Sequence, residues 1–285
     1  MNILSIQSWV SYGHVGNAAS MFPLQRLGAE VWAVNTVQFS NHPGHGDWTG
    51  RVGTGAEVTA LIDGIERRGA FGRCDAVLSG YMGDVSVAAS VLDAVGRVRA
   101  ANPAMLYCCD PVIGDGGRVY VRDGIPEMIA GKAVPQADVL TPNQFELERL
   151  SGVPCSDAAS VRRAIEVVRG RMRPGGPRAV LLTSATLAET PAGTLDIVAA
   201  DDGGIATVQI PALAVAASGA GDMMAALFLF HLLQLRDAGA AMAAAAAAAH
   251  AVLTLTAEQG ARDLLLIEAQ NFLVAPPQMF QLRKF

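Results

Sequence analysis

An aspartate preceded by two glycines late in the chain has the setting best suited to chemistry. It lies in ASGAGDMM, residues 217–224, which leads directly into the apolar run AALFLFHLL. Glycines 219 and 221 let backbone N–H groups point outward at a helix start, where the helix dipole is also positive. Such a place accepts a phosphate, and Asp222 beside it is placed to take a proton from a substrate hydroxyl as general base. A plain helix with an acidic first turn is the alternative, and the short Gly-x-Gly-Asp pattern alone favours it.

Other phosphate-binding motifs are missing from the sequence. The two lysines, Lys132 and Lys284, are followed by alanine and phenylalanine, so the chain has no Walker A loop. No G-x-G-x-x-G follows the first predicted strand, which argues against a dinucleotide site. A nucleotide that binds here must therefore be held without a P-loop lysine.

Two further clusters contain carboxylates. Asp110 and Asp115 stand in CCDPVIGDGG, at the end of a predicted strand and in the glycine-rich turn after it. Near a phosphate they would hold Mg²⁺ directly or through its waters, but turn formation explains the segment about equally well. In TPNQFELERL, Asn143 and Glu146 match a capping box, and the local sequence favours that interpretation over a place for Glu146 near metal-bound waters. Ser8, after the first strand, either binds a substrate or caps the next helix.

Short apolar runs alternate with amphipathic stretches along the chain, which predicts strands separated by helices. We expect strands at 2–7, 30–36, 75–79, 105–109, 138–141 and 178–183, and helices at 16–27, 55–68, 86–100, 144–151 and 157–171. TLDIVAA and IATVQIP bracket DDGG as a hairpin, and helices at 220–235, 238–255 and 259–272 follow. The pattern predicts a single domain, residues 1–285, of the doubly wound α/β class, with a mostly parallel central sheet flanked by helices on both faces.

Polar residues follow nearly every predicted strand. Ligands of open α/β sheets bind at the carboxyl ends of the strands, so we expect these residues to converge on one edge of the sheet. They are Ser8, Asn41, Gly80, Tyr81, Asp110, Thr141, Pro142, Asn143, Thr183 and Ser184.

Composition and charge narrow the partners. The net charge of −5 and the lack of any basic run argue against nucleic acid. The alanine-rich stretch 238–255 is better explained as a closely packed core helix than as a membrane span. The N-terminus shows no basic leader or cleavage site, and the four cysteines show no metal-ligand spacing and suit free thiols in a reducing compartment. We expect a cytoplasmic protein without a membrane partner.

Taken together, the quoted segments resemble the pyridoxal kinases of the ribokinase-like superfamily. The similarity rests on LSIQSWVSYGHVGN, GAEVWAVNTVQFSNHPGHGDWTG, LSGYMGD, CDPVIGD, TPNQFELERLSG and GAGD, in the order and spacing of that family from residue 3 to about 226. NTVQFSNH is the most specific, whereas GAGD marks only the superfamily. The resemblance implies a ribokinase-like fold and transfer of the γ-phosphoryl group of ATP to the 5′-hydroxyl of pyridoxal, in vitamin B6 salvage. It also implies Mg²⁺, a stimulating monovalent cation and a homodimer.

The resemblance implies roles for single residues as well. Asp222 would deprotonate the hydroxyl, with an anion hole formed by the backbone of Gly219, Ala220 and Gly221. The residues it places at the substrate are Ser8, Val15, Pro43, Gly44, Tyr81 and Asp222. Those at the nucleotide are Asp110, Thr141, Asn143, Glu146, Thr183, Ser184, Ile210, Pro211, Ala212 and Leu213. Those around Mg²⁺ and the phosphates are Asp110, Asp115 and Glu146.

Three residues depart from the pattern of that family. Trp9 stands where the family usually has histidine, Pro43 where many members have a substrate-contacting threonine, and Ala220 where GTGD has threonine. Two alternatives therefore stay open: a kinase of the hydroxymethylpyrimidine type, and a non-catalytic vitamer-binding relative. The intact Asp222 favours an enzyme, and an aspartate of ordinary pKa suffices if it accepts the proton late. A sugar kinase would carry lid strands in the N-terminal half, where the sequence shows no hairpin signal.

Overall fold

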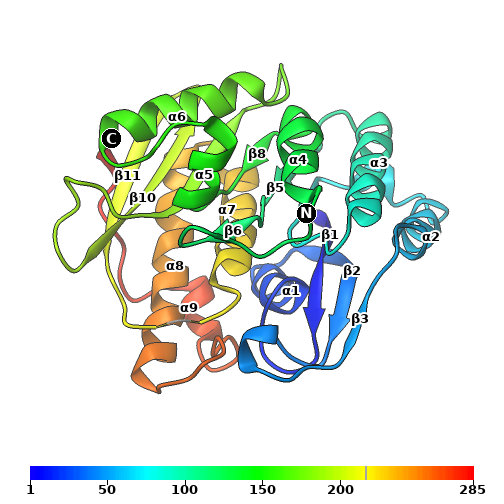
Figure 1. Cartoon of the computed structure of the whole chain (residues 1–285), viewed down its shortest axis with the longest axis horizontal. Helices are drawn as coiled ribbons and strands as arrows, with labels where there is room; N and C mark the ends of the chain where they lie inside the picture. The colour runs from blue at the N-terminus through cyan, green and yellow to red at the C-terminus, as the bar shows by residue number, and fades with distance from the viewer. Residues whose placement is uncertain (216) are drawn as a thin grey trace.

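A ten-stranded sheet runs through the middle of the molecule in the computed structural model, which describes residues 1–215 and 217–285 (Figure 1). The strand order is β12-β11-β10-β9-β8-β5-β4-β1-β2-β3. The central strands are parallel: β1 (Asn2–Val10), β2 (Glu30–Phe39), β4 (Ala76–Ser79), β5 (Leu106–Cys109), β8 (Val139–Leu140) and β9 (Ala179–Ala185). The edges are antiparallel: β10 (Thr194–Asp201), β11 (Gly204–Pro211) and β12 (Arg283–Lys284) on one side, β3 (Gly50–Val52) on the other. The predicted mostly parallel sheet is confirmed.

Helices cover both faces of the sheet (Figure 1). On one face lie α1 (Asn17–Arg26), α7 (Ala220–Leu235), α8 (Ala238–Glu258) and α9 (Gln270–Val274). On the other lie α2 (Gly55–Glu66), α3 (Val85–Ala101), α4 (Ile125–Met128), α5 (Gln144–Ser151) and α6 (Ala158–Arg171). Strand β5 serves both faces, because Leu106 and Cys108 pack on the first and Tyr107 and Cys109 on the second. Successive side chains of a strand point to opposite faces, so a strand covered on both sides is apolar throughout.

Short elements fill the connections. Helical turns occur at Pro43–His45, Phe71–Arg73, Ile129–Ala133 and Val134–Gln136, and β6 (Gly114–Asp115) pairs with β7 (Arg118–Val119) in a separate hairpin. The sequence prediction did not include α4, the β6–β7 hairpin or β12, and the structure differs from it in two further places. Residues 259–269 are not helical, because α8 continues to Glu258 and Gly260 then adopts a left-handed φ of 61° that ends it. The N-terminal half does contain an antiparallel pair, since the three-residue β3 joins β2 although it is too short to give a sequence pattern.

Helix α8 is, within the described part of the chain, the one helix long and apolar enough to cross a membrane. It lies instead against α7 and the sheet, with 61% of its apolar window buried in protein. Ala241, Ala245 and Ala248 have almost no exposed surface. Their small side chains let the helix approach its neighbours closely, so the packing supports a core helix.

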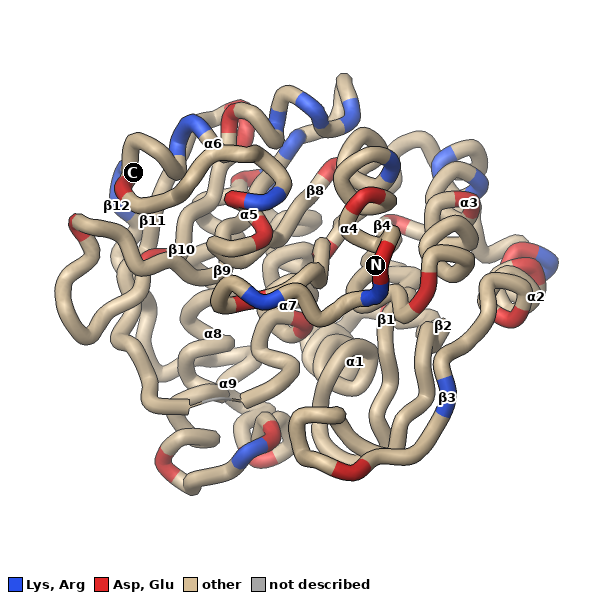
Figure 2. The backbone as a smooth tube through the Cα atoms, viewed as in Figure 1, with Lys and Arg blue, Asp and Glu red and all other residues tan. Residues whose placement is uncertain are grey.

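Arginine carries nearly all the positive surface charge. Figure 2 shows basic positions gathered along α6 and the turn after it, while acidic and basic positions alternate on α2 and α3. The two lysines are both exposed, Lys132 in the turn Ile129–Ala133 and Lys284 in the edge strand β12.

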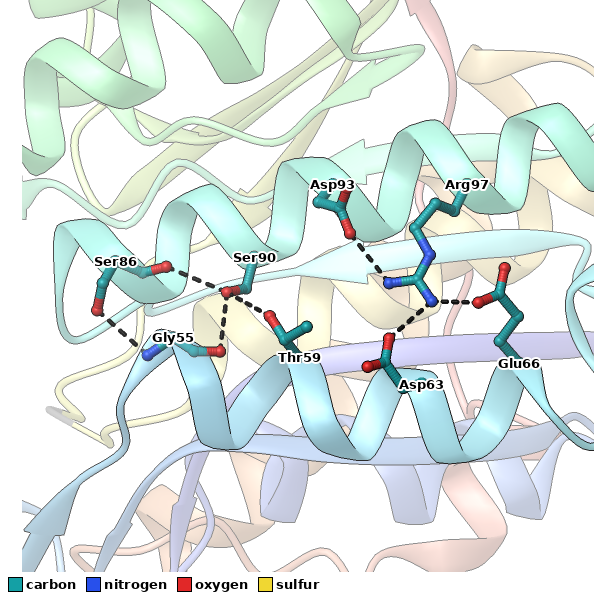
Figure 3. A network of polar contacts seen from close by, with 8 residues as sticks. All are labelled: Gly55, Thr59, Asp63, Glu66, Ser86, Ser90, Asp93 and Arg97. Carbon is teal, nitrogen blue, oxygen red and sulfur yellow. Dashed lines mark hydrogen bonds and ion pairs between the residues drawn. The ribbon is translucent and has the colours of Figure 1, made fainter.

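A polar network joins α2 to α3 (Figure 3). The Arg97 guanidinium pairs with Asp63 at 2.8 Å, with Asp93 at 3.0 Å and with Glu66. Nearer the helix starts, the Ser90 hydroxyl donates to the carbonyl oxygen of Gly55 at 2.9 Å. The network fixes α3, whose N-terminus begins directly after the loop that follows β4.

Replacing Arg97 with methionine should lower the free energy of unfolding by about 1–2 kcal/mol, because three carboxylates lose their shared cation. The loss should shrink in 0.5 M salt, which screens the remaining repulsion. Urea unfolding at low and high salt measures this, with the exposed Arg68→Met as the control. Equal, salt-independent losses in the two variants would contradict the role of Arg97.

Candidate active site

The N-terminus of α7 lies against the loop between β1 and α1. Oδ2 of Asp222 accepts a hydrogen bond of 2.8 Å from the backbone N–H of Gly16, which joins residues 206 positions apart. Gly219 caps the helix with a φ of 88°, and a Cβ at this position would overlap the carbonyl oxygen of His14. Only glycine fits such a position. The contact brings the Gly-Ala-Gly-Asp segment to the carboxyl end of β1.

The first turn of α7 is open to a ligand. No side chain among the described residues caps this helix, so its first N–H groups keep their capacity to donate. Apart from its chain neighbours and the backbone of its own helix, no described atom lies within 4 Å of the position that a Cβ on Gly221 would occupy. Open space beside uncapped N–H groups at a helix N-terminus suits an anion such as a phosphate.

Asp222 has an unusual protonation equilibrium for an aspartate. Burial raises its pKa to about 6, and the hydrogen bond from Gly16 opposes the rise only in part. The side chain keeps partial contact with solvent. The expectation of an ordinary pKa is therefore wrong, because Asp222 lies directly beside the buried Met223 and Met224 and its carboxyl group loses much of its contact with water. A carboxylate of this pKa is still mostly ionised at pH 7 and is a stronger base than an exposed aspartate.

A buried polar network connects the backbone of Asp222 to the first strand. The Ser20 hydroxyl donates to the Asp222 carbonyl oxygen at 3.1 Å and accepts from Gln7 Nε2 at 3.0 Å. Gln7 Nε2 also lies 2.9 Å from the Ser5 oxygen, and Ser5 donates to Asn17 Oδ1 at 2.7 Å. This network was not predicted; its one signal in the sequence is the presence of polar residues inside the apolar first strand.

Asp110 lies just after β5 and is 6% exposed. Its Oδ1 accepts a hydrogen bond of 3.1 Å from the Thr141 hydroxyl. Burial, followed by the negative charges of Glu146 and Asp222, raises the pKa of Asp110 well above its usual range. A cation brought to this carboxylate would restore its ionised form.

Glu146 and Asn143 form the capping box that the local sequence predicts. Glu146 Oε2 accepts from the N–H of Asn143 at 3.0 Å, and Oε1 accepts from the N–H groups of Ile113 at 2.7 Å and Gly114 at 3.3 Å. Asn143 Nδ2 donates to the carbonyl oxygen of Gly114 at 2.8 Å. Burial raises the pKa of Glu146 despite these donors. The box also ties α5 to the β6–β7 hairpin, which carries Asp115.

Of the three predicted Mg²⁺ residues, Asp110 fits best as a direct ligand. Both oxygens of Glu146 already accept from backbone N–H groups, and exposed Asp115 accepts from the N–H of Gly116 at 2.7 Å. Over residues 1–215 and 217–285, no three His, Cys, Asp or Glu side chains are grouped closely enough to hold a metal. A Mg²⁺ ion here would therefore take most of its ligands from substrate phosphates and water, as this ion commonly does.

The predicted substrate residues lie around the ends of β1, β2 and β4. Val15 and Tyr81 pack in one small apolar cluster with Val10, Val37 and Phe39. Burial raises the pKa of Tyr81. This cluster forms an apolar wall close to the Gly16–Asp222 contact.

Ser8 is 8% exposed, and its oxygen adjoins Gly16 so closely that a Cβ on Gly16 would overlap it. Ser8 and Asp222 therefore lie on either side of the same glycine. Pro43 and Gly44 lie in the turn Pro43–His45, which follows β2 and reaches the segment before α7.

The predicted nucleotide residues occupy the neighbouring part of the edge. Thr183, in β9, donates its N–H to the carbonyl oxygen of Pro142 at 3.0 Å, next to Asn143. Ser184 follows it in the same strand. Ile210 and Pro211 end β11, and the N–H of Ala212 donates to the carbonyl oxygen of Gly193 at 2.9 Å, so Leu213 begins the connection toward α7.

Tyr120 lies near the candidate site and was not predicted from the sequence. It follows β7 and is 53% exposed. Partial desolvation comes first among the causes that raise its pKa, and four nearby carboxylates add to the effect. These are Glu146, Asp110, Asp222 and Asp115. The only signal for it was an aromatic residue in the glycine-rich turn GDGGRVYV.

The chain is similar in sequence to known kinases. Residues 70–264 match the family model described as phosphomethylpyrimidine kinase. Pyridoxal kinase PdxY of Granulibacter bethesdensis is 54% identical over 281 residues, covering 98% of each chain. Pyridoxal kinase PdxY of Rubrobacter xylanophilus is 52% identical over 286 residues, covering 100% of this chain and 97% of that one.

Solved structures of pyridoxal kinase superimpose closely on this chain. Pyridoxal kinase from Leishmania donovani in complex with ADP and ginkgotoxin superimposes with a TM-score of 0.91 at 29% identity, covering 99% of this chain and 98% of that one. The same enzyme in complex with ADP and pyridoxine gives a TM-score of 0.89 at 29% identity and the same coverage.

The raised pKa of Asp222 predicts that Asp222→Asn stabilises the protein. A native pKa of about 6, against an ordinary value of 3.8, means that ionisation disfavours the folded state once the pH rises through this window. The variant should exceed the wild type by up to about 3 kcal/mol at pH 7.5, and the gain should vanish near pH 4. Urea unfolding at both pH values tests this, with exposed Asp47→Asn as the control. A gain of equal size at both pH values would rule out the titration of Asp222 as its cause.

Proposed function

Because the chain belongs to the phosphomethylpyrimidine kinase family and, within it, to the pyridoxal kinases, we propose that it transfers the γ-phosphoryl group of ATP to the 5′-hydroxyl of pyridoxal. The product is pyridoxal 5′-phosphate, as vitamin B6 salvage requires. The observation that carries the mechanism is the place of Asp222 at the uncapped start of α7, beside Gly16.

Asp222 acts as the general base. Its Oδ2 is held by the N–H of Gly16, which leaves Oδ1 to receive the proton of the 5′-hydroxyl. The hydroxyl oxygen forms its bond to the γ-phosphorus, the bond from this phosphorus to the β-phosphate oxygen breaks, and ADP leaves. Such a loose transition state needs aligned groups and charge stabilisation more than covalent help from the protein.

The backbone N–H groups of Gly219, Ala220 and Gly221 form the anion hole. They lie at the positive end of the α7 dipole, so they favour the charge that builds on the transferred group. Ala220 serves as well as the threonine of GTGD, because the donors here are backbone groups.

The remaining substrate contacts come from the residues around the ends of β1, β2 and β4. Ser8 hydrogen-bonds a polar group of the pyridine ring, Val15 and Tyr81 cover its apolar face, and Pro43 and Gly44 close the opposite side. On the nucleotide side stand Asp110, Thr141, Asn143, Glu146, Thr183 and Ser184, with Ile210, Pro211, Ala212 and Leu213 at the adenine.

Mg²⁺, when bound, neutralises charge on the phosphates. We propose that Asp110 holds it directly and that Asp115 and Glu146 act through water, since the oxygens of Glu146 are already engaged. A stimulating monovalent cation, a homodimer and a cytoplasmic location complete the proposal, and they rest on the family alone.

Wild type and Asp222→Asn, assayed for ATP-dependent formation of pyridoxal 5′-phosphate, test the assignment. Loss of the base should lower kcat by about 10²–10⁴-fold and leave the affinity for ATP within twofold. Hydroxymethylpyrimidine is tested as a second substrate in the same assay. Turnover of the pyrimidine alone would show that the substrate is hydroxymethylpyrimidine and not pyridoxal. Binding of both ligands without turnover would show that the protein is a non-catalytic vitamer-binding relative.

The pH dependence of kcat/KM gives a second test. Asp222 must be ionised to accept a proton, so kcat/KM should rise with pH and level off above the pKa of Asp222 in the free protein, which is about 6. Residual activity of Asp222→Asn should lack this inflection. An inflection that persists in the variant belongs to another group and would remove Asp222 from the role of base.

A further inference from the structure

Two loops at the site are joined by side chains to which the proposed mechanism gives no role. The substrate loop, residues 40–49, connects β2 to β3 and carries Pro43 and Gly44. The anion-hole segment, residues 217–219, leads into α7. The two are far apart in sequence, and His42 and Ser218 bring them into contact.

The hydrogen bonds of His42 fix its tautomer. Nδ1 accepts the backbone N–H of Gly44 at 3.2 Å, and this partner can only donate. Nδ1 therefore carries its lone pair, and the Ser218 hydroxyl, 3.1 Å away, donates to the same nitrogen. Burial and the neighbouring His45 lower the pKa of His42, which agrees with a neutral ring.

A second group of contacts supports the same closure. His45 Nε2 lies 3.2 Å from Oδ1 of Asp263, and the Arg262 guanidinium donates to the carbonyl oxygen of Gly44 at 3.2 Å. Ser218 and Asp263 also pair through an isolated backbone bridge. The substrate loop is thus tied to the anion-hole segment and to the turn after α8, which itself pairs with that segment.

Ser218 directly precedes Gly219, whose position is set by contact with the His14 carbonyl. Any displacement of the substrate loop therefore acts on the start of α7. We propose that His42 is a positioning residue for phosphoryl transfer, whose Nδ1 couples closure of the substrate loop to the alignment of the N–H groups of Gly219 to Gly221. The inference deepens the proposed function and rests on it.

Two substitutions of His42 separate its Nδ1 from its bulk. In His42→Asn, the amide oxygen can take the place of Nδ1, whereas in His42→Gln the amide oxygen reaches toward the position of Nε2. We expect His42→Asn to keep kcat within about threefold of wild type and His42→Gln to lower it about tenfold, the worth of one or two neutral hydrogen bonds. KM for ATP should stay within twofold in both.

Ser218→Ala should reproduce the loss of His42→Gln, and the double variant should lose no more than either single one, because all three remove the same contact. Additive losses would overturn the coupling. Equal kcat values for His42→Asn and His42→Gln would overturn the role of Nδ1. Asp47→Asn, in the same loop, controls for general effects of substitution.

Hydrogen exchange of the ligand-free protein supplies a readout independent of turnover. The amides of Gly44 and of residues 217–222 should exchange faster in His42→Gln than in wild type, and at the wild-type rate in His42→Asn. Unchanged exchange in His42→Gln would overturn the contact itself. A wild-type protein that does not phosphorylate pyridoxal would overturn the proposed function and the coupling with it, while exchange would still decide whether the contact exists.

Discussion

The close contact between the start of α7 and the β1–α1 loop is the constraint on which the site depends. The N–H of Gly16 holds Asp222, and Gly219 fits against the His14 carbonyl because it has no side chain. Through this contact the first strand of the sheet, which carries the substrate wall, meets the helix that carries the base and the anion hole. Neither element alone contains a complete site, so the chemistry exists only once the two distant parts of the chain have docked.

The site concentrates negative charge. Asp110, Glu146 and Asp222 all have raised pKa values, and burial is the first cause in each case. Ionisation of these carboxylates, which catalysis requires, therefore lowers the stability of the free folded protein. A ligand that brings Mg²⁺ relieves this cost, and binding to the folded state alone also stabilises it. Stability and activity oppose each other here, as often happens where a functional group is held in an unfavourable environment.

The parts of the fold that a sequence specifies locally were predictable. Apolar runs gave the strands of the sheet, and the spacing of Asn143 and Glu146 gave the capping box, since both patterns involve neighbours in the chain. Contacts between distant residues were not predictable in this way. Nothing local in the sequence marks His42 and Ser218, 176 positions apart, as partners, and the pKa of Asp222 follows from what surrounds it in space. The glycine that ends α8 was visible, but its effect depends on a left-handed backbone that a helical pattern does not reveal.

The scarcity of lysine limits side reactions with the proposed substrate. Pyridoxal and its phosphate are aldehydes, and primary amines condense with aldehydes to give imines. The only lysines are exposed, Lys132 in a helical turn and Lys284 in an edge strand, while the residues around Asp222 offer hydroxyls, carboxylates and backbone N–H groups. Arginine provides positive charge elsewhere without a nucleophilic amine, because its guanidinium stays protonated. The site therefore presents no lysine with which a bound aldehyde could condense, and neither substrate nor product is lost there as an imine of the protein.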